Sequence, residues 1–361
     1  SNSSAASDVY KRQIAYNEEQ NINGILECIK NQDYDHNNME VVLVDGASTD
    51  NTRALMCEFA LDNKDEFRRV VVLDNPKKTL PSGWNVALRE YKGDAIIKVD
   101  AHAVIPEDFV SKNVRVLETG EYICGGQRPN IIDKPTPFKE TLLLAESSMF
   151  GSSIASYRNN PGKTYVKSLF HAAYRREVFE KVGFFNEELV RTEDNEIHYR
   201  MRKAGYKLCF DPDIISYQYT RSSLKAMLKQ KYANGYWIGK TSKVCPKCLS
   251  IYHFVPFAFV SAIIASGSVI GATGLAECIK KRHNHTLGKG ISALRKVTVV
   301  LTTVMWVLYA LMASGMAAVS AFKAEDKRNI TNACLPVLFL LLHLSYGIGT
   351  IAGLMDKSKR G

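Results

Sequence analysis

The sequence predicts an α/β domain followed by a helical region that associates with a membrane. Between residues 15 and 213, short β-branched runs alternate with helical patterns, which is typical of βαβ units and a mostly parallel sheet. In the last third of the chain, three apolar stretches are each long enough to cross a hydrocarbon core. The charge changes with the pattern: residues 1–213 carry 28 Lys and Arg against 33 Asp and Glu, whereas residues 214–361 carry 19 against 4.

The composition is that of a folded protein, and it argues against nucleic acid as a partner. Of the 361 residues, 46% are hydrophobic and 23% are charged, which excludes a disordered or collagen-like chain. A nucleic-acid-binding domain is expected to carry positive charge, whereas the first part of this chain is acidic. The basic residues accompany apolar runs instead, as they do in membrane segments with basic flanks.

Each element of the predicted α/β domain has its own signal. Strands are expected at Val41–Val44, Val70–Leu73 and Ala95–Val99, where β-branched residues cluster. A crossover helix is expected over Ile22–Ile29, because its apolar residues recur on one face. A further helix is expected over Ser82–Tyr91.

The changes in composition give four predicted segments. Residues 1–14 are polar and lack an initiating Met, and we interpret them as a non-native or truncated start in which a first strand has lost most of its apolar residues. Residues 15–220 form the α/β domain. Residues 221–250 are expected to form an amphipathic interface segment, and residues 251–361 a membrane domain with two to three transmembrane helices.

Two of the predicted strands end in an aspartate, Asp45 and Asp100. Ligands of open parallel sheets bind at the carboxyl ends of the strands, so these two carboxylates predict one shared crevice. The alternative for Asp45 is a turn with Gly46, and Ser48 or Asp50 equally suits a helix cap. No glycine-rich phosphate-binding run follows any strand, so dinucleotide and P-loop chemistry are not expected.

The run Asp100-Ala101-His102 offers a different way to meet phosphate charge. Residues at positions i and i+2 of an extended chain project to the same side, so Asp100 and His102 can share a divalent cation. Oxygen and imidazole ligands suit manganese, and magnesium is also compatible. The alternative for His102 is a hydrogen-bonded loop residue.

A third acidic cluster, containing Glu193, Asp194 and Glu196, begins a helical pattern. One interpretation of this cluster is structural, because acidic residues in the first turn of a helix interact favourably with the helix dipole. Three carboxylates within four positions exceed what capping requires, and a carboxylate near a sugar hydroxyl can act as a general base.

With these motifs in this order, the chain resembles the family 2 inverting glycosyltransferases of GT-A fold, from Ala15 to about Lys243. Within that family it looks most like the membrane glycosyltransferases of bacterial succinoglycan biosynthesis. The matching motifs are Tyr16-Asn17-Glu18-Glu19, Asp45 in VDGASTD, NPxxTxPxxxN from Asn75 to Asn85, Asp100 to His102, GGxxRP from Gly125 to Pro129, and Glu193-Asp194.

The resemblance implies a donor site, a metal site and a base. It implies that a nucleotide-sugar, with UDP as the expected nucleotide and glucose as the expected sugar, contacts Tyr16, Asn17, Glu18, Asp45, Asn85 and Asp100. It implies that Asp100 and His102 hold Mn or Mg on the diphosphate, which neutralises the leaving group. It further implies that Asp194 deprotonates the acceptor hydroxyl with support from Glu193, so that the configuration inverts.

For the acceptor, the resemblance points to a polyprenyl-diphosphate-linked oligosaccharide of exopolysaccharide biosynthesis, near His171, Gln230 and Trp237. The chain departs from the family at Gly46, where the second Asp of DDGSTD is expected. It also lacks the QxxRW motif of processive synthases, which favours addition of a single sugar. Two alternatives remain: a polyprenyl-phosphate sugar synthase, and a non-catalytic membrane scaffold that retains the fold.

The segment Arg221–Lys247 carries seven Lys and Arg and no acids, and its apolar residues have helical spacing. This pattern is typical of an amphipathic helix on an anionic leaflet, with a solvated basic face as the alternative. Trp237 is interpreted either as a stacking surface for an acceptor sugar or as an interfacial anchor. The eight cysteines are expected to be packing residues, although Cys245 and Cys248 form a CxxC pair.

The three apolar stretches are Phe254–Ala276, Val297–Phe322 and Ala333–Met355. The first is rich in Ser, Gly and Ala, and a re-entrant or interfacial element is its alternative. Three crossings would place the basic loop Lys280–Lys296 outside, against the positive-inside tendency. Residues 1–40 contain no apolar signal-peptide core, so the expected location is the inner (cytoplasmic) membrane, multi-pass, with a cytosolic catalytic domain.

Overall fold

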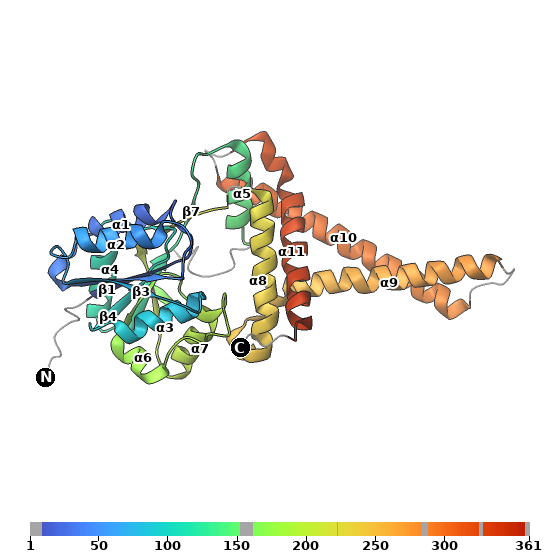
Figure 1. Ribbon diagram of the computed structural model, residues 1–361. Coiled ribbons are helices and arrows are strands. Elements are labelled where there is room, and N and C mark those ends of the chain that lie inside the picture. The colour runs from blue at the N-terminus through green and yellow to red at the C-terminus, as the bar shows by residue number, and fades with distance from the viewer. Residues whose placement is uncertain (1–8, 152–161, 222, 283–287, 325–327, 358–361) are drawn as a thin grey trace.

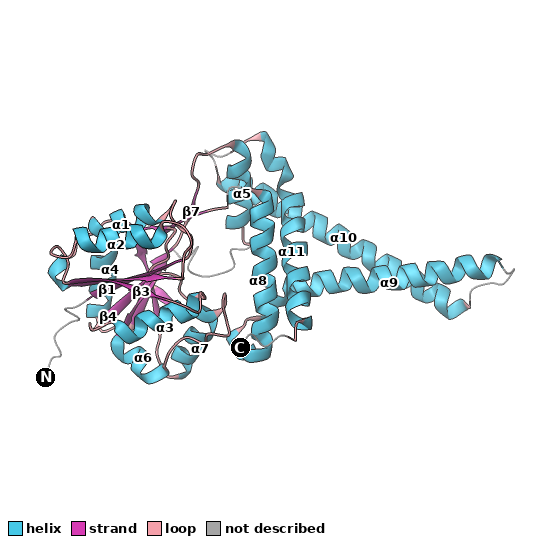
Figure 2. Ribbon diagram, in the orientation of Figure 1, coloured by secondary structure: helices cyan, strands magenta, loops and turns pink. Residues whose placement is uncertain are grey.

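The computed structural model describes residues 9–151, 162–221, 223–282, 288–324 and 328–357. Its first part is an α/β domain around an eight-stranded sheet with the order β3-β2-β1-β4-β9-β6-β10-β8 (Figure 2). Six of these strands run in one direction, and β9 and β8 run in the other, so the predicted mostly parallel sheet is confirmed. The strands of this sheet are β1 (Val9–Ala15), β2 (Met39–Asp45), β3 (Arg69–Asp74), β4 (Ala95–Lys98), β6 (Ile123–Gln127), β8 (Thr164–Val166), β9 (Ala172–Arg175) and β10 (Leu208–Ile215).

Helices cover both faces of this sheet (Figure 1). One face carries α1 (Ile22–Lys30), α2 (Thr52–Asp62) and α4 (Phe109–Glu118), whose apolar residues form a core with β1, β2 and β4. The other face carries α3 (Leu80–Glu90), α6 (Arg176–Val182) and α7 (Glu193–Lys203), which pack in a second core around Trp84 and Tyr174. The strands and helices expected over Ile22–Ile29, Val41–Val44, Val70–Leu73, Ser82–Tyr91 and Ala95–Val99 are therefore present, with boundaries shifted by one or two residues.

The first strand is present and ends at Ala15, and the hypothesis that this strand has lost most of its apolar residues stays a prediction. Strand β1 lies at the centre of the sheet and pairs in parallel with both β2 and β4, in register from Val9 with Met39 and Ala95. Ladder hydrogen bonds join backbone groups, so a strand with few apolar residues can still occupy a central position. The α/β domain accordingly begins before residue 15.

A smaller three-stranded sheet links this domain to the helical region. Its strands are β5 (Ala103–Val104), β11 (Tyr217–Tyr219) and β7 (Asn130–Ile131), with β11 between the other two. Strand β5 follows the Asp100 to His102 run, and β11 leads into α8 (Leu224–Val244). The short sheet therefore ties the predicted metal motif to the start of the helical region.

Helix α8 packs in parallel along α11 (Leu335–Met355), and α5 (Pro137–Ser147) adjoins both (Figure 1). The two long helices approach closely because glycines lie at the contact. A Cβ at Gly235 would lie 2.0 Å from Tyr346 O, and one at Gly349 would lie 2.1 Å from Tyr232 O. Small residues permit this separation between helices, as they do in membrane proteins.

The helix expected over Arg221–Lys247 is thus confirmed as α8. Its packing differs from that of an amphipathic helix on a leaflet, which would leave one polar face free. Its buried residues include Met227, Trp237 and Thr241, and glycines seat one side on α11. Two interior contacts give the reason: Ser345 Oγ donates to Leu228 O, and Lys231 Nζ lies 3.6 Å from Glu146 Oε1 of α5. Its position at a membrane interface stays a prediction.

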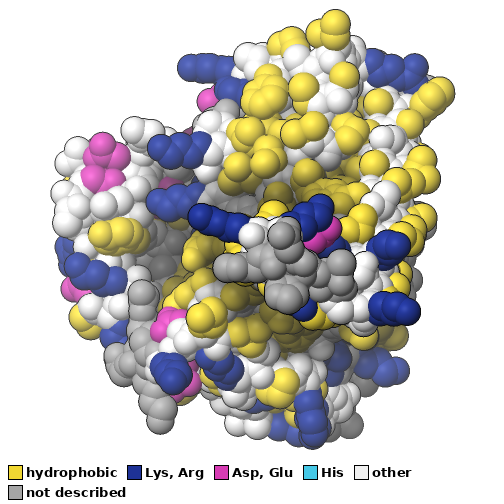
Figure 3. All heavy atoms as spheres, turned by 90° about the vertical axis from the view of Figure 1, so that its right-hand side faces the viewer, with side chains coloured by type: hydrophobic (Ala, Val, Ile, Leu, Met, Phe, Trp, Pro, Cys, Tyr) yellow, Lys and Arg dark blue, Asp and Glu magenta, His cyan; other side chains and the backbone are white. Residues whose placement is uncertain are grey.

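Helices α9 (Val255–Arg282) and α10 (Lys289–Lys323) project from the body of the molecule as a long arm (Figure 1). Three helical segments, 251–282, 289–323 and 330–355, are long and apolar enough to cross a membrane, and they indicate membrane association. Helix α9 is continuous, so it is not a broken re-entrant element. Figure 3 shows hydrophobic side chains over much of the face from which the arm projects, with Lys and Arg among them. The 3₁₀ turns of the described residues are His36–Asn38, Pro246–Cys248, Ile251–Phe254 and Ile330–Cys334.

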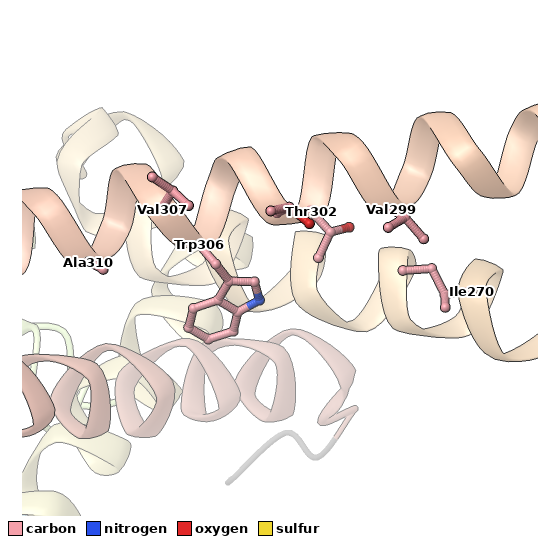
Figure 4. Close-up of a pocket in the computed structure, with 7 residues that line it drawn as sticks. Ile270, Val299, Thr302, Trp306, Val307 and Ala310 are labelled. Atoms are coloured by element: carbon pink, nitrogen blue, oxygen red, sulfur yellow. The ribbon is translucent and has the colours of Figure 1, made fainter.

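An apolar pocket of about 390 Å³ lies between α9 and α10 (Figure 4). The indole of Trp306 and the side chains of Val299 and Ile270 border it. This pocket belongs to the projecting arm, and its walls contain none of the acidic motifs of the α/β domain.

Candidate functional site

The loops that follow β1 and β2 lie against each other at the carboxyl edge of the sheet. The Asn17 backbone N–H donates to Ser48 Oγ at 3.0 Å, and the Thr49 backbone N–H donates to Asn17 Oδ1 at 2.8 Å. The Glu18 backbone N–H donates to Thr52 Oγ1 at 2.8 Å. Asn17 has a φ of 53°, in the left-handed region that Asn tolerates best among residues other than Gly. The two loops therefore fix each other, while the Tyr16 side chain is about half exposed.

Asp45 ends β2 and is 1% exposed. Its carboxylate accepts the Ser48 backbone N–H, three residues further on, at 3.2 Å, which agrees with the turn role named as the alternative for Asp45. Gly46 is tightly enclosed, because a Cβ there would lie 3.1 Å from Ala15 O and 3.2 Å from Tyr16 Cβ. A larger residue at position 46 therefore requires the Tyr16 loop to shift slightly.

Asp100 follows β4 at the same edge, with its side chain 15% exposed. Its Oδ2 lies 3.7 Å from His171 Nε2, and its backbone N–H donates to the same nitrogen at 3.4 Å. Burial alone raises the pKa of the Asp100 carboxyl, but His171 and the nearby Lys98 ammonium outweigh burial and hold this pKa below its usual range. Asp100 is therefore an ionised carboxylate at the mouth of the site.

His102 lies between two polar partners. The Gln218 side-chain amide nitrogen contacts His102 Nε2 at 2.9 Å, and His102 Nδ1 lies 3.8 Å from Glu18 Oε1. An amide nitrogen only donates, so Nε2 accepts and the proton of a neutral ring is on Nδ1, toward Glu18. Metal binding through Nε2 thus requires Gln218 to release it. His102 is thus a hydrogen-bonded loop residue in the structure, which is the alternative that the sequence leaves open.

Asp100 and His102 fit a cation that is shared with a phosphate ligand. Among the described residues, no group of three or more His, Cys, Asp or Glu side chains is placed to hold a metal ion. An ion held mainly by a diphosphate and water needs only one or two protein ligands. An ionised carboxylate and an imidazole two residues apart meet that requirement, so the residues suit Mn²⁺ or Mg²⁺ on a diphosphate.

Lys98, the last residue of β4, joins this edge to the third acidic cluster. Its Nζ lies 2.6 Å from Asp194 Oδ1 and 3.9 Å from Glu193 Oε1, and the Lys98 and Glu193 side chains are about 95% buried. Lys98 also lies over the ring of Trp84, 5.1 Å from its centroid. The first turn of α7 is therefore held against β4 by a buried ion pair.

Two carboxylates share this one ammonium, and their protonation states differ. Burial and the Asp194 charge raise the pKa of Glu193 to about 8. In addition, Glu193 Oε2 is buried and has no hydrogen-bond partner among the described residues. Burial also raises the pKa of Asp194, and the Lys98 ammonium opposes that effect. Asp194 is much closer to Lys98, so we assign the negative charge to Asp194 and a proton to Glu193 at neutral pH.

Asn85 is buried, and its amide is fully engaged within the protein. Its Nδ2 donates to Phe185 O and to Glu187 Oε1, both at 2.9 Å, and its Oδ1 accepts the Phe185 backbone N–H at 2.9 Å. These bonds hold α3 to the loop that leads to the acidic cluster. The structure thus gives Asn85 a positioning role, and a donor contact stays a prediction.

The three predicted acceptor residues lie in two places. His171 is buried beside Asp100, with Nδ1 2.9 Å from Ser216 Oγ, and burial lowers its pKa. Gln230 and Trp237 lie two turns apart on α8; Gln230 Oε1 is buried without a hydrogen-bond partner among the described residues, and Trp237 is 9% exposed. Their acceptor roles stay predictions.

Helix α8 reaches the acidic cluster directly. Arg191 Nη1 donates to Asn234 Oδ1 at 2.9 Å, and the hydroxyls of Thr192 and Thr241 are hydrogen-bonded to each other. Asn234 and Thr241 are seven residues apart and so lie on one face of α8. The residues that immediately precede the candidate base are therefore clamped to the helix that packs along α11.

Sequence reasoning missed Lys98 and Arg191. Lys98 interrupts the apolar run Ala95–Val99 and precedes Asp100 by two residues, so both side chains project to the same side of the strand. A lysine inside a buried strand almost always has an acidic partner, and that signal was available. The position of Arg191 depends on how α8 packs, which no local pattern specifies.

The sheet, its acidic carboxyl edge and the helices on both faces define an α/β domain of the GT-A class, followed by long apolar helices. A solved mannosyltransferase from Pyrobaculum calidifontis, in complex with GDP-Man and Mn²⁺, superposes with a TM-score of 0.57 at 17% identity, covering 98% of this chain and 90% of its own. Residues 14–183 match the family model for glycosyl transferase family 2. The α/β domain of this chain, which contains the matched residues, is therefore a glycosyltransferase family 2 domain.

Two curated relatives show how far the similarity extends. The succinoglycan biosynthesis protein ExoA of Rhizobium meliloti (strain 1021) is 30% identical over 203 residues, which is 55% of this chain and 59% of that protein. A dolichyl N-acetyl-α-D-glucosaminyl phosphate 3-β-D-2,3-diacetamido-2,3-dideoxy-β-D-glucuronosyltransferase of Methanococcus voltae is 27% identical over 257 residues, which is 69% of this chain and 78% of that protein.

Proposed function

We propose that this protein is an inverting, metal-dependent glycosyltransferase that adds one sugar, with glucose from a UDP-sugar as the expected donor, to a lipid-linked oligosaccharide in exopolysaccharide biosynthesis. The observation that carries the proposal is the buried contact of 2.6 Å between Lys98 and Asp194. It brings an ionised carboxylate to the end of β4, two residues before Asp100. The candidate base and the candidate metal ligand Asp100 therefore both lie near the carboxyl end of β4.

In the proposed reaction, the loops after β1 and β2 bind the nucleotide, with Tyr16, Asn17, Glu18 and Asp45 as the candidate contacts. Asp100 and His102 would hold Mn²⁺ or Mg²⁺, which supplies positive charge to the diphosphate as it leaves. The acceptor hydroxyl oxygen attacks the anomeric carbon from the face opposite the diphosphate. The bond between this carbon and the diphosphate oxygen breaks, and the nucleoside diphosphate leaves with the bonding electrons.

Asp194 receives the proton of the acceptor hydroxyl in this proposal. Lys98 occupies its Oδ1, so Oδ2 is the atom that accepts the proton. Glu193 is protonated at neutral pH, which avoids two adjacent negative charges and leaves the Lys98 charge to Asp194. The structure therefore supports Asp194 as the general base and Glu193 as a neutral neighbour.

The expected donor and acceptor are drawn from the relatives. The Rhizobium relative supports exopolysaccharide synthesis, and the name of the Methanococcus relative supports a lipid-linked glycan acceptor. The Pyrobaculum neighbour, solved with GDP-Man, makes a GDP-sugar the first competitor of a UDP-sugar in any test. The three apolar helices support an acceptor in a membrane, with an inner-membrane location and a cytosolic catalytic domain as proposed.

The alternative of a polyprenyl-phosphate sugar synthase keeps the same donor site and differs only in the acceptor. The alternative of a non-catalytic scaffold rests on the altered first strand and on Gly46, and the first of these is weakened because a strand is present at the centre of the sheet. A scaffold has no need for a buried lysine that pairs with the acidic cluster.

Sugar transfer by Asp194→Asn tests the proposal. This substitution preserves the side-chain shape, so we expect transfer to fall at least a hundredfold while donor binding is retained. Asp213→Asn, which changes an exposed carboxylate on β10, is the matched control and is expected to leave transfer unchanged. Full turnover by Asp194→Asn would refute the assigned base.

A further inference from the structure

Helix α11 differs from α9 and α10 in how much of it the protein covers. Of the 18 most apolar residues of segment 330–355, 39% are buried, whereas in segments 251–282 and 289–323 the share is 6%. Figure 1 shows the reason: α11 lies along α8 beside the α/β domain, and the arm of α9 and α10 leaves from the opposite side of this helix pair. The three apolar segments therefore do not share one environment.

Both ends of α11 are held by elements that adjoin the α/β domain. Before α11, Thr141 Oγ1 of α5 donates to Asn332 Oδ1 at 2.7 Å, and α5 contacts β7 of the small sheet. After α11, Lys240 Nζ of α8 lies 3.4 Å from Asp356 Oδ2, and this part of α8 is clamped to the residues before the candidate base. A helix that crosses a membrane has its ends on opposite sides. Two ends held on the same side therefore indicate that α11 does not cross.

The packing of α11 on α8 leads to the same conclusion. The two helices run in parallel, with close contacts from Leu228 and Ser345 to Tyr236 and Gly353. The longest stretch of α8 without a charged residue is Tyr232–Gly239, eight residues, whereas a crossing needs about 20 apolar residues. Because α8 cannot cross a hydrocarbon core and α11 has the same direction, α11 does not cross it either.

The exposed residues of α11 form a single apolar stripe. Within Leu335–Met355, every residue of which the structure describes, the exposed side chains are Val337, Ile348 and Met355. Steps of 11 and 7 residues are close to whole turns of an α-helix, so the three side chains lie along one line of the helix surface. An apolar stripe on a helix that lies along a folded domain is typical of a helix in the membrane interface, with this stripe among the acyl chains.

The distribution of charge favours the same arrangement. If only α9 and α10 cross, residues 221–254 and 323–361 lie on one side with thirteen Lys and Arg, and residues 277–296 lie on the other with six. If α11 also crosses, residues 356–361 change sides, and the counts become ten and nine. Lys and Arg are enriched on the cytoplasmic side of membrane proteins. With the α/β domain in the cytosol, as proposed, two crossings agree better with this tendency than three.

We propose that α8 and α11 lie in the plane of the membrane interface, and that only the arm of α9 and α10 crosses the bilayer. The stripe of Val337, Ile348 and Met355 contacts the acyl chains of the leaflet that faces the α/β domain. The exposed Lys225 and Lys229 of α8 contact anionic headgroups of the same leaflet. The α/β domain and the end of α11 lie on one side of the membrane, and the tip of the arm lies on the other.

The side of the membrane that each segment faces tests this arrangement. A short protease-recognition peptide is inserted into the full chain at one of three exposed positions: after Lys64 in a turn of the α/β domain, after Arg282 at the end of α9, or after Lys357 beyond α11. Cleavage is measured in sealed membrane vesicles of both orientations, and cleavage in detergent shows that each site is accessible. We expect the Lys64 and Lys357 sites to be cut in the same vesicles, and the Arg282 site only in vesicles of the opposite orientation.

Two results would overturn the proposal. Cleavage of the Lys357 site in vesicles that protect the Lys64 site would show that α11 crosses the membrane. Cleavage of the Arg282 site in the same vesicles as the Lys64 site would show that the arm does not cross.

A matched pair of substitutions tests the depth of α11. Ile348 of α11 and Val304 of α10 are each 49% exposed. Val304→Lys puts a charge in the hydrocarbon core and should lower the amount of membrane-integrated protein about tenfold or more. Ile348→Lys lets the ammonium reach the headgroups and should lower this amount less than about twofold. An equal loss in both variants would place α11 in the hydrocarbon core and contradict the proposal. Neither measurement uses sugar transfer, so failure of the proposed function leaves both results intact.

Discussion

Lys98 Nζ and Asp194 Oδ1 lie 2.6 Å apart in the interior of the protein, and this contact joins strand β4 to the first turn of α7. Burial lowers the pKa of Lys98, but Asp194 and Glu193 outweigh burial and raise it, so the lysine is charged. The contact therefore sets both the position and the charge of the candidate base. Its removal affects stability and catalysis in ways that experiments can separate.

We expect Lys98→Met to lower kcat about a hundredfold or more, because Asp194 loses the charge that favours its ionised form. Stability should fall by about 3 kcal/mol, since one buried charge is left unpaired. The double variant Lys98→Met with Asp194→Asn should regain most of the stability and none of the activity. Urea unfolding and initial rates measure the two effects, and a double variant as unstable as Lys98→Met would contradict the ion-pair account.

Asn85→Ala separates a structural role from a donor contact. The substitution leaves the Phe185 N–H and C=O without their partner, so we expect a loss of about 2 kcal/mol in the free energy of unfolding. At a temperature where the variant is folded, donor KM should stay within about threefold of the wild type while kcat falls. A tenfold rise in donor KM with unchanged stability would show that Asn85 contacts the donor.

Acid should destabilise the α/β domain through His198. This ring is buried between Tyr174 OH and Ser168 Oγ, and Lys98 and Arg202 add positive charge nearby. Burial, with these charges, lowers its pKa from 6.5 to about 3. The unfolded state therefore binds a proton below pH 6.5 that the folded state rejects, and stability is lost as the pH falls.

The expected loss through His198 is on the order of 2 kcal/mol between pH 7 and pH 5. His198→Gln cannot take up this proton, so its stability should change less over the same interval. Thermal or urea unfolding of both proteins at several pH values measures the difference. Parallel pH profiles would show that His198 does not carry the effect.

The contact between α8 and α11 predicts different effects for two glycines that both lie in apolar helices. A Cβ at Gly349 would lie 2.1 Å from Tyr232 O, so Gly349→Ala must separate the helices and should cost about 2 kcal/mol. Gly271 of α9 has no neighbouring atom within 4 Å of such a Cβ, and Gly271→Ala should be neutral or stabilising. Thermal unfolding in detergent compares the two, and equal effects would argue against close packing.

The parts of the structure that sequence patterns predicted are those that depend on local periodicity. The strand Val41–Val44 and the helix over Ile22–Ile29 follow from spacing alone, and family motifs brought out Asp100 and Asp194. Most of strand β1 falls in the segment interpreted as a non-native or truncated start, because its backbone pairing with β2 and β4 leaves no apolar signature in the sequence. The burial of His171 and the fit of α8 on α11 depend on contacts between residues far apart in the chain.

Donor binding by the full chain tests the central claim most directly. Thermal shift or calorimetry with UDP-glucose, UDP-galactose and GDP-mannose, each with and without Mn²⁺, covers the expected donors. We predict that one nucleotide-sugar stabilises the protein only when Mn²⁺ or Mg²⁺ is present, and that Asp100→Asn abolishes this stabilisation. Stabilisation that does not depend on the metal, or that persists in Asp100→Asn, would contradict the metal site, and no stabilisation by any nucleotide-sugar would contradict the proposed transferase.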